Sequence, residues 1–359
     1  MLLAAPSARA QEAEAVATAT EQEQADEDAD RKNVEFVGIP VPDYNGVLGW
    51  GLGVFAAALY RVDPDDEDSQ PSMTALGGFY AQNETWFWGI GQRLSLHGDR
   101  FRAGGGYGQG DFNFQFFPGN FVPELPADLV IPFNTQGSFA FGEFSTKVWR
   151  KLYLGAKYRW AEAATEFDVG RPDGRGVALP TRTFSGLGPA ASYDSRDNVF
   201  NASEGTNLEY STRFDRPGLG SGASFETTEI KLNNYFTLRE GNILAARAFI
   251  GVATGDVPFE GQFVFGGIDL RGYNQGEFRG NEKYAFQGEY RWNFYGRLGL
   301  VAFGGFGWVA TDGEFSPVLP SIGTGFRFRA AQQYNVNIGV DVAKGRNDWS
   351  LRFALGEAF

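Results

Sequence analysis

Long stretches of the chain alternate between apolar and polar residues, and this alternation constrains the fold more than any other feature. Between residues 284 and 294, Tyr, Phe and Trp occupy one face of an extended chain, whereas Gln287, Glu289 and Arg291 occupy the other. The same alternation runs through 151–161, 229–239 and 335–343. A period of two with a single apolar face is typical of β-strands that have one wet side.

The alternating segments are longer than the strands of most soluble proteins. They run for about 10 to 19 residues, against a usual strand length of about 5 to 6. Aromatic residues such as Tyr158 and Trp160 gather toward their ends. The sequence has no run of about 18 apolar residues that would form a membrane helix. Long strands with aromatic girdles predict an all-β fold, a transmembrane antiparallel β-barrel in the bacterial outer membrane, in contact with outer-membrane lipids.

The number of strands follows from counting these segments. About fifteen segments between Gly46 and Phe359 have the pattern of a strand, whereas bacterial single-chain barrels usually have an even number. Either one strand is missing from the count, with 34–41 as the candidate, or one of the segments is false. The sequence therefore predicts sixteen strands, with fourteen as the alternative.

The first 33 residues differ in composition from the rest of the chain. Ala8-Arg9-Ala10 fits a small-residue cleavage site before Gln11, so residues 1–10 are interpreted as a residual signal peptide. An Ala-rich disordered start is the alternative. Residues 11–33 are acidic, contain no aromatic residue and are predicted to be disordered. The outer-membrane β-barrel is expected to occupy residues 34–359.

Composition excludes several classes of function. The chain has no Cys and a single His, which excludes thiol nucleophiles and Cys-based metal sites and argues against a His-rich zinc site. Its formal net charge of −13 argues against electrostatic binding of nucleic acid. No G-x-S-x-G or P-loop motif occurs. We therefore expect no catalytic residues, no cofactor and no metal, and we do not expect an enzyme.

Two motifs go beyond a generic barrel. The first lies in 193–200 and consists of Tyr193, Asp194, Arg196, Asp197 and Asn198. The second is Gly-Gly-Ile-Asp-Leu-Arg-Gly-Tyr at 266–273, followed by Glu289-Tyr290-Arg291. In this order they resemble the BamA/TamA family of the Omp85 superfamily, also called bacterial surface antigens. The terminal Phe359 resembles the C-terminal signal of bacterial outer-membrane proteins.

The resemblance implies that Arg271, Gly272 and Tyr273 form the tip of a long loop, 255–282, that folds back into the barrel. In the family an Asp on the second strand after the loop usually faces this Arg, but Gly305 stands here. A buried guanidinium needs a carboxylate partner. The alternation of inward and outward positions along each strand, or strand parity, places Glu289 and Asp341 on the inward face. Glu289 is therefore the first candidate and Asp341 the second. Without the resemblance, Arg271, Gly272 and Tyr273 would be interpreted as an ordinary exposed turn.

The resemblance also implies a function in protein insertion, translocation or lipid transport, with client proteins or lipids as candidate partners. Such machines have a weak seam between the first and last strands. About 35 residues between Gln11 and Asn45 leave no room for the family's periplasmic POTRA domains, so we expect a barrel-only member. A passive pore, a structural surface antigen and the exporter half of a split system are the alternatives. A homo-oligomer is a candidate assembly.

Overall fold

The structure is a computed structural model that describes residues 34–66, 68–120, 124–126, 129–170, 176–273, 276–332, 334–346 and 349–359. The expected signal peptide, 1–10, lies outside the described residues. So does the expected acidic segment, 11–33, and its assignment stays a prediction.

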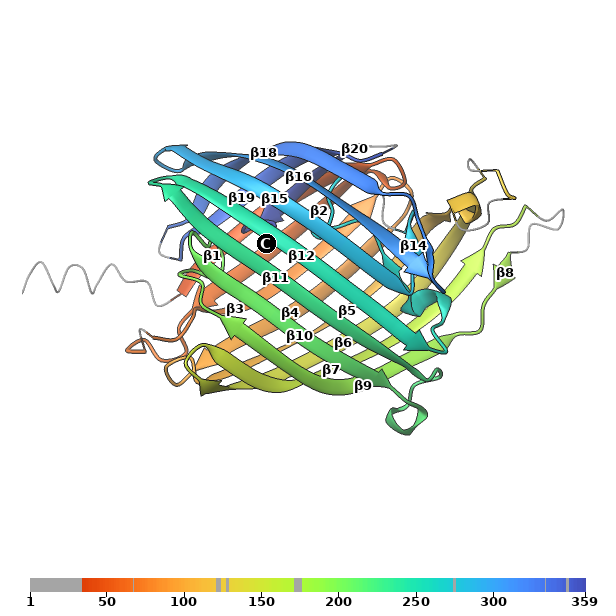
Figure 1. Cartoon of the computed structure of the whole chain (residues 1–359), viewed down its shortest axis with the longest axis horizontal. Helices are drawn as coiled ribbons and strands as arrows, with labels where there is room; N and C mark the ends of the chain where they lie inside the picture. The colour runs from red at the N-terminus through yellow and green to blue at the C-terminus, as the bar shows by residue number, and fades with distance from the viewer. Residues whose placement is uncertain are drawn as a thin grey trace, which may run out of the picture.

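The described residues form one barrel of long, tilted strands (Figure 1). Its wall strands are β1 (Val34–Asn45), β2 (Gly49–Tyr60), β3 (Ser72–Ala81), β4 (Trp86–Leu96), β5 (Phe101–Phe116), β6 (Ile131–Trp149), β7 (Leu152–Phe167), β9 (Arg182–Asp194), β10 (Gly205–Asp215), β11 (Phe225–Arg239), β12 (Asn242–Gly255), β15 (Glu282–Tyr295), β16 (Leu298–Thr311), β18 (Leu319–Ala331), β19 (Val336–Lys344) and β20 (Trp349–Leu355). These are sixteen strands, as the alternation predicts.

Short elements complete the fold. β8 (Val177–Ala178) extends the wall beside β7, and β17 (Glu314–Phe315) extends it beside β16. β13 (Phe263–Val264) and β14 (Arg279–Gly280) form a separate two-stranded sheet. Three single turns of 3-10 helix are η1 (Pro118–Asn120), η2 (Pro217–Leu219) and η3 (Phe259–Gly261). Within the described ranges, no helix is long and apolar enough to cross a membrane.

Each wall strand pairs antiparallel with the wall strands next to it in the chain, and β1 meets β20 to close the barrel. The strand missing from the sequence count is β1, which contains the candidate segment 34–41. The prediction of sixteen strands is therefore confirmed, and fourteen is wrong.

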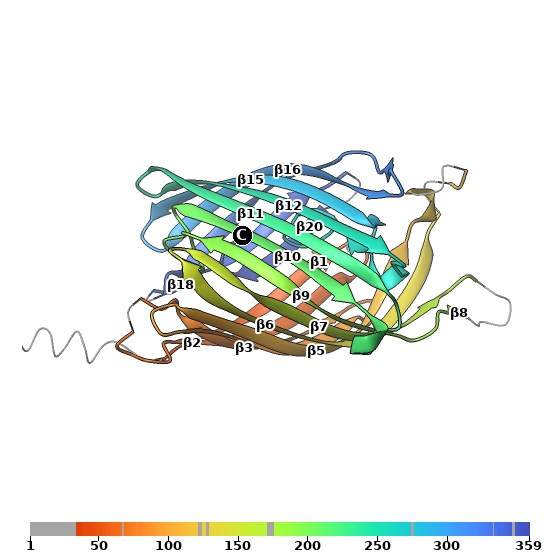
Figure 2. The ribbon, with the colours of Figure 1, turned by 60° about the horizontal axis from the view of Figure 1, so that its bottom comes forward.

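The two ends of the barrel differ (Figures 1 and 2). At the turn end, two residues suffice to join β6 to β7, β11 to β12 and β15 to β16. Gly241 and Gly296 lie in two of these turns with φ of 73° and 51°, a conformation that costs glycine little. At the loop end, the connections 117–130, 168–181 and 256–281 are much longer.

Side chains alternate between the outside and the lumen along each strand, as β15 illustrates. Glu289 and Arg291 are 1% and 2% exposed, whereas Tyr290 and Trp292 are 38% and 45% exposed. The outward face of β15 is therefore apolar and aromatic, which fits contact with lipid. The inward face carries charges that are paired in the lumen.

The lumenal face of β3 to β6 is more apolar than the wet side that the alternation predicts for each strand. Register partners in a sheet share a face, and Phe79 on β3 pairs with Phe87 on β4. Phe139 and Phe141 on β6 pair with the inward-facing Gly108 and Gly106 of β5. These strands depart from the expected wet side, because Phe and Gly occupy many of their inward positions.

Candidate functional site

The connection between β12 and β15 folds back into the barrel and brings its own apolar core. Phe265 and Leu270 are fully buried, and Tyr273 and Phe278 are 6% and 2% exposed. They pack against the inward side chains Phe249, Ala285, Val309 and Leu319 of the wall. The expected inward-folded loop is present, and burial of these side chains explains why it does not extend into solvent.

Arg271, at the tip of this loop, is 3% exposed and its guanidinium is held on three sides. Nη2 lies 2.7 Å from Oε2 of Glu289, and Nη1 lies 2.8 Å from Oδ2 of Asp341. Nε donates to Oε1 of Gln287 at 3.0 Å. The guanidinium carbon also lies 3.3 Å from the ring centroid of Phe303, a cation–π contact. Both carboxylates named from strand parity therefore contact Arg271.

The two residues after Arg271 fit tightly into the wall. Gly272 has a φ of 93°, and a Cβ there would lie 2.7 Å from the backbone nitrogen of Gly345. Tyr273 donates its hydroxyl hydrogen to the carbonyl oxygen of Pro320 at 2.5 Å. Only glycine combines this backbone conformation with so close an approach. The tip is thus fixed by backbone fit as well as by charge.

Gly305, which replaces the family's usual Asp, faces the lumen beside the loop. A Cβ at this position would clash with the carbonyl oxygen of Phe286. It would also lie 2.8 Å from Cγ of Gln287 and 3.1 Å from Cδ1 of Leu270. The neighbouring strand β15 and the loop together pack so closely here that no side chain fits. Glu289 and Asp341 supply the negative charge from neighbouring positions of the lumen.

The ion pairs of Arg271 continue toward the turn end. Oε1 of Glu289 accepts from Nε of Arg291 at 2.8 Å. Oδ1 of Asp341 lies 2.6 Å from Nη1 of Arg327, whose Nε lies 2.8 Å from Oε2 of Glu357. Three Arg and three carboxylates therefore alternate through the lumen, with no net charge. Strand parity identified Glu289 and Asp341 and also predicts that Arg327 faces the lumen, whereas nothing in the sequence marked Glu357.

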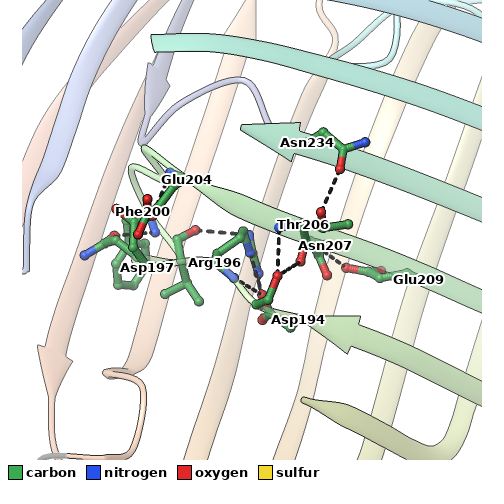
Figure 3. A network of polar contacts seen from close by, with 12 residues as sticks. Asp194, Arg196, Asp197, Phe200, Glu204, Thr206, Asn207, Glu209 and Asn234 are labelled. Atoms are coloured by element: carbon green, nitrogen blue, oxygen red, sulfur yellow. Dashed lines mark hydrogen bonds and ion pairs between the residues drawn. The ribbon is translucent and has the colours of Figure 1, made fainter. Parts of the chain in front are cut away.

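The first motif forms the end of β9 and the connection to β10 at the turn end (Figure 3). Arg196 binds Asp194 with two hydrogen bonds, Nε to Oδ1 at 2.9 Å and Nη2 to Oδ2 at 3.1 Å. Oδ2 of Asp194 also lies 2.8 Å from Nη1 of Arg102, which in turn binds Asp99. Tyr193 points outward and is 39% exposed. The sequence did not single out Arg102, because an isolated Arg has no motif around it.

The rest of the motif folds the connection onto itself (Figure 3). Oδ1 of Asp197 accepts from the backbone N–H of Ser203 at 2.9 Å. Oδ1 of Asn198 accepts from the backbone N–H of Phe200 at 2.8 Å, and its Nδ2 donates to the carbonyl oxygen of Tyr334 at 3.2 Å. These contacts hold the β9–β10 connection against the β18–β19 turn.

Comparison with known proteins agrees with this geometry. Residues 135–359, more than half of the chain, match the Omp85 superfamily domain. The chain belongs to the Omp85 superfamily. The resemblance carried by the two motifs is thereby confirmed. No curated protein matches this Omp85 chain significantly.

Solved structures of Omp85 type have the same fold. BamA from Haemophilus ducreyi lacking POTRA domains 1–3 superposes with a TM-score of 0.58 at 13% identity, over 90% of this chain and 70% of that one. CdiB from Acinetobacter baumannii gives 0.59 at 14%, over 90% and 60%. CdiB from Escherichia coli gives 0.63 at 11%, over 90% and 63%. At these identities the likeness shows the fold alone.

The seam of this Omp85 barrel, between β1 and β20, is weak. Twelve register pairs join β1 to β2 and seven join β19 to β20. Within the described parts of β1 and β20, Tyr44 with Leu351 is the one register pair across the seam. Tyr44 also stacks on Trp349 at 4.6 Å between ring centroids. Pro40 and Pro42 lie on β1 and have no N–H to donate, which is typical of an edge strand.

The last residues of the Omp85 barrel turn inward instead of continuing the wall. The last wall strand, β20, ends at Leu355 and so does not reach Phe359. Asn337 donates Nδ2 to Oε1 of Glu357 at 2.6 Å, and Nη2 of Arg291 donates to the carbonyl oxygen of Phe359 at 2.8 Å. Phe359 packs against the lumenal Tyr235. The tail turns inward because buried cations of the lumen hold it there, and so it adds no pairs to the seam.

Proposed function

We propose that this chain is an outer-membrane barrel that inserts proteins into the membrane or translocates them across it. The observation that carries the proposal is the seam, where the described parts of β1 and β20 share a single register pair. The backbone N–H and C=O groups of an unpaired strand edge can pair with another strand. A client segment can therefore form the hydrogen bonds that the seam itself lacks.

The outer surface supports the proposed location. Large apolar side chains such as Leu52, Val54 and Ile90 are 61%, 62% and 51% exposed on the outside of the wall. In water such a surface would promote aggregation, whereas lipid solvates it. Short turns face the periplasm in barrels of this kind and long loops face outward. We therefore place the turn end in the periplasm.

The filled lumen favours a gated machine over a passive pore. The loop tip at Arg271 and the tail at Glu357 both lie inside the barrel, and Arg271 and Glu357 belong to one network of ion pairs. We assign Arg271, Gly272, Tyr273, Glu289 and Asp341 to a latch that holds the loop. The loop and the tail reduce the open cross-section of the lumen. The seam is then the weakest part of the barrel wall.

A disulfide across the seam tests the proposal. The chain has no Cys, so Tyr44→Cys with Leu351→Cys creates one defined pair at register partners. The oxidised protein in proteoliposomes is expected to lose insertion of an unfolded outer-membrane barrel by on the order of tenfold or more. Reduction should restore the rate, because only seam opening is blocked. Insertion is measured by the gain of heat-modifiable mobility of the client.

A matched disulfide within a continuous ladder serves as the control. Thr212 and Thr228 are register partners on β10 and β11, with 2.9 Å between their hydroxyl oxygens. Thr212→Cys with Thr228→Cys should leave the insertion rate unchanged on oxidation. A locked seam that inserts clients at the parent rate would contradict the proposal. A large conductance that is the same with the seam disulfide oxidised and reduced would favour the passive pore.

A further inference from the structure

Part of the lumen is lined by aromatic rings that are left partly uncovered by the described side chains. Phe87 on β4 and Phe139 and Phe141 on β6 face inward, yet they are 41%, 43% and 46% exposed. Phe87 stacks on Phe79 at 5.5 Å and lies 6.1 Å from Phe112 between ring centroids. We call these five Phe residues the aromatic wall. Rings left this exposed inside a barrel provide an apolar surface for a ligand.

Glycines on β5 make room for the aromatic wall. A Cβ at Gly106 would lie 2.6 Å from Cε1 of Phe141, and one at Gly108 would lie 2.5 Å from Cζ of Phe139. The rings therefore lie directly over the backbone of the neighbouring strand. This explains the glycine-rich segment 104–110, whose inward positions must be empty for the rings to lie flat.

The adjoining wall, from β6 to β11, is charged and balanced. Nζ of Lys157 lies 3.4 Å from Glu143 and 3.7 Å from Glu209, and Lys231 lies 2.9 Å from Glu229. Arg159 and Arg213 both pair with Asp215, at 3.7 and 3.1 Å. Four cations thus face four carboxylates. The lumen therefore has one apolar side and one charged side of mixed sign.

The aromatic wall reaches the seam. A cavity of about 240 Å³ is lined by Phe79 and Phe87 together with Val41 of β1, Arg352 of β20 and Arg271 of the latch. A ligand on the aromatic wall would thus lie beside the poorly paired edge of β1. The surface and the seam are continuous.

We infer that the aromatic wall binds the apolar face of an extended, amphipathic polypeptide on its way to the seam. This deepens the proposed function, on which it rests, by assigning the surface inside the barrel that binds the chain. Successive side chains of an extended chain point to opposite sides, which matches a lumen with one apolar and one charged side. The four cations of these ion pairs are matched by four carboxylates, an arrangement that suits a chain with charges of both signs better than an anionic lipid headgroup.

A binding measurement tests this inference. The probe is a fluorescent synthetic peptide in which Val and Tyr alternate with Thr, Lys and Glu, and its affinity is read from fluorescence anisotropy. Phe87→Gln with Phe141→Gln should weaken binding on the order of tenfold or more, because two apolar contacts become polar. Phe87→Leu with Phe141→Leu should retain most of the affinity. Phe315→Gln, a 63% exposed ring of β17 outside the aromatic wall, is the matched control and should bind like the parent.

A second measurement leaves every ring in place. Glu143, beside Phe141 on the lumenal face of β6, is replaced by Cys, and its labelling by a maleimide is followed with and without the peptide. The peptide should protect Glu143→Cys and not Glu240→Cys in the exposed β11–β12 turn. The inference would be overturned if the peptide did not slow the labelling of Glu143→Cys. It would also be overturned if Phe87→Gln with Phe141→Gln bound the peptide with the parent's affinity.

A lipid ligand is the remaining outcome, and oleate is its probe. Oleate that displaces the peptide and protects Glu143→Cys more strongly than the peptide does would overturn the polypeptide ligand in favour of an acyl chain.

Failure of this inference can be distinguished from failure of the proposed function. If the seam disulfide blocks insertion while the Gln pair binds normally, only this inference fails. If the peptide binds the aromatic wall while the locked seam inserts normally, only the proposed function fails.

Discussion

Replacement of Arg271 by alanine is expected to release the long loop from the lumen and to destabilise the barrel. Breaking a buried ion pair typically costs about 3–5 kcal/mol. The lower end applies to this site, because Glu289 keeps Arg291 and Asp341 keeps Arg327 as partners. The free energy of unfolding should fall accordingly, as measured by denaturant titration with heat modifiability as the readout. Proteolysis within 256–281 should accelerate at the same time.

A double-mutant cycle shows whether the latch is one interaction. Glu289→Ala removes the same ion pair from the other side, so the double variant should cost less than the sum of the single variants. Arg213→Ala is the control, since this lumenal Arg binds Asp215 at 3.1 Å, and neither residue belongs to the network of ion pairs around Arg271. Strict additivity of Arg271→Ala and Glu289→Ala would contradict the latch, as would equal loop proteolysis in the Arg213 variant.

Gly305→Asp, which restores the residue usual in the family, is expected to harm this protein. Its side chain would have to displace Leu270 and Gln287, which lie 3.1 and 2.8 Å from the position of the new Cβ. Overpacking of this kind typically costs about 1–3 kcal/mol. Gly305→Ala should cause much of the same loss, because the Cβ alone makes the contact. Both are measured by denaturant titration and by proteolysis of the loop.

The comparison of these two variants separates packing from charge. If Gly305→Asp stabilises the barrel while Gly305→Ala destabilises it, then Arg271 prefers a carboxylate on β16 to Glu289 and Asp341. That result would contradict close packing as the reason for glycine at position 305. Gly304→Ala is a matched control, because Gly304 faces outward beside Gly305 and a Cβ there meets only the carbonyl oxygen of Ser321, at 3.5 Å.

The alternation of the sequence was sufficient to predict the barrel, because each strand with one lipid face carries its own signature. β1 escaped the count for a physical reason. Gly38, Pro40 and Pro42 interrupt its pattern, and Pro is disfavoured in strands except at edges. The irregular residues that hid β1 are thus the same ones that suit it to the seam.

Two features could not be predicted from alternation. On β5 the outward face contains Tyr107 and the inward face contains Phe112, so both faces carry aromatic residues and periodicity cannot say which one faces lipid. The tail after Leu355 has no period, and its position depends on Arg327 and Arg291, which are distant in sequence. For the latch, parity predicts which carboxylates face inward, but only the fold of the loop decides which of them Arg271 contacts.

Hydrogen–deuterium exchange of β1 in the membrane-embedded protein tests the central claim, that β1 is fully paired with β2 but only weakly paired with β20. The amides of β1 that point toward β20 should exchange on the order of a hundredfold or more faster than those of β11, which is paired to both β10 and β12. Amides of β1 that point toward β2 should be protected. This alternation of fast and slow amides along Val34–Ile39, where every residue has a backbone N–H, is the predicted result. Uniform protection of β1, equal to that of β11, would contradict the weak seam and the function built on it.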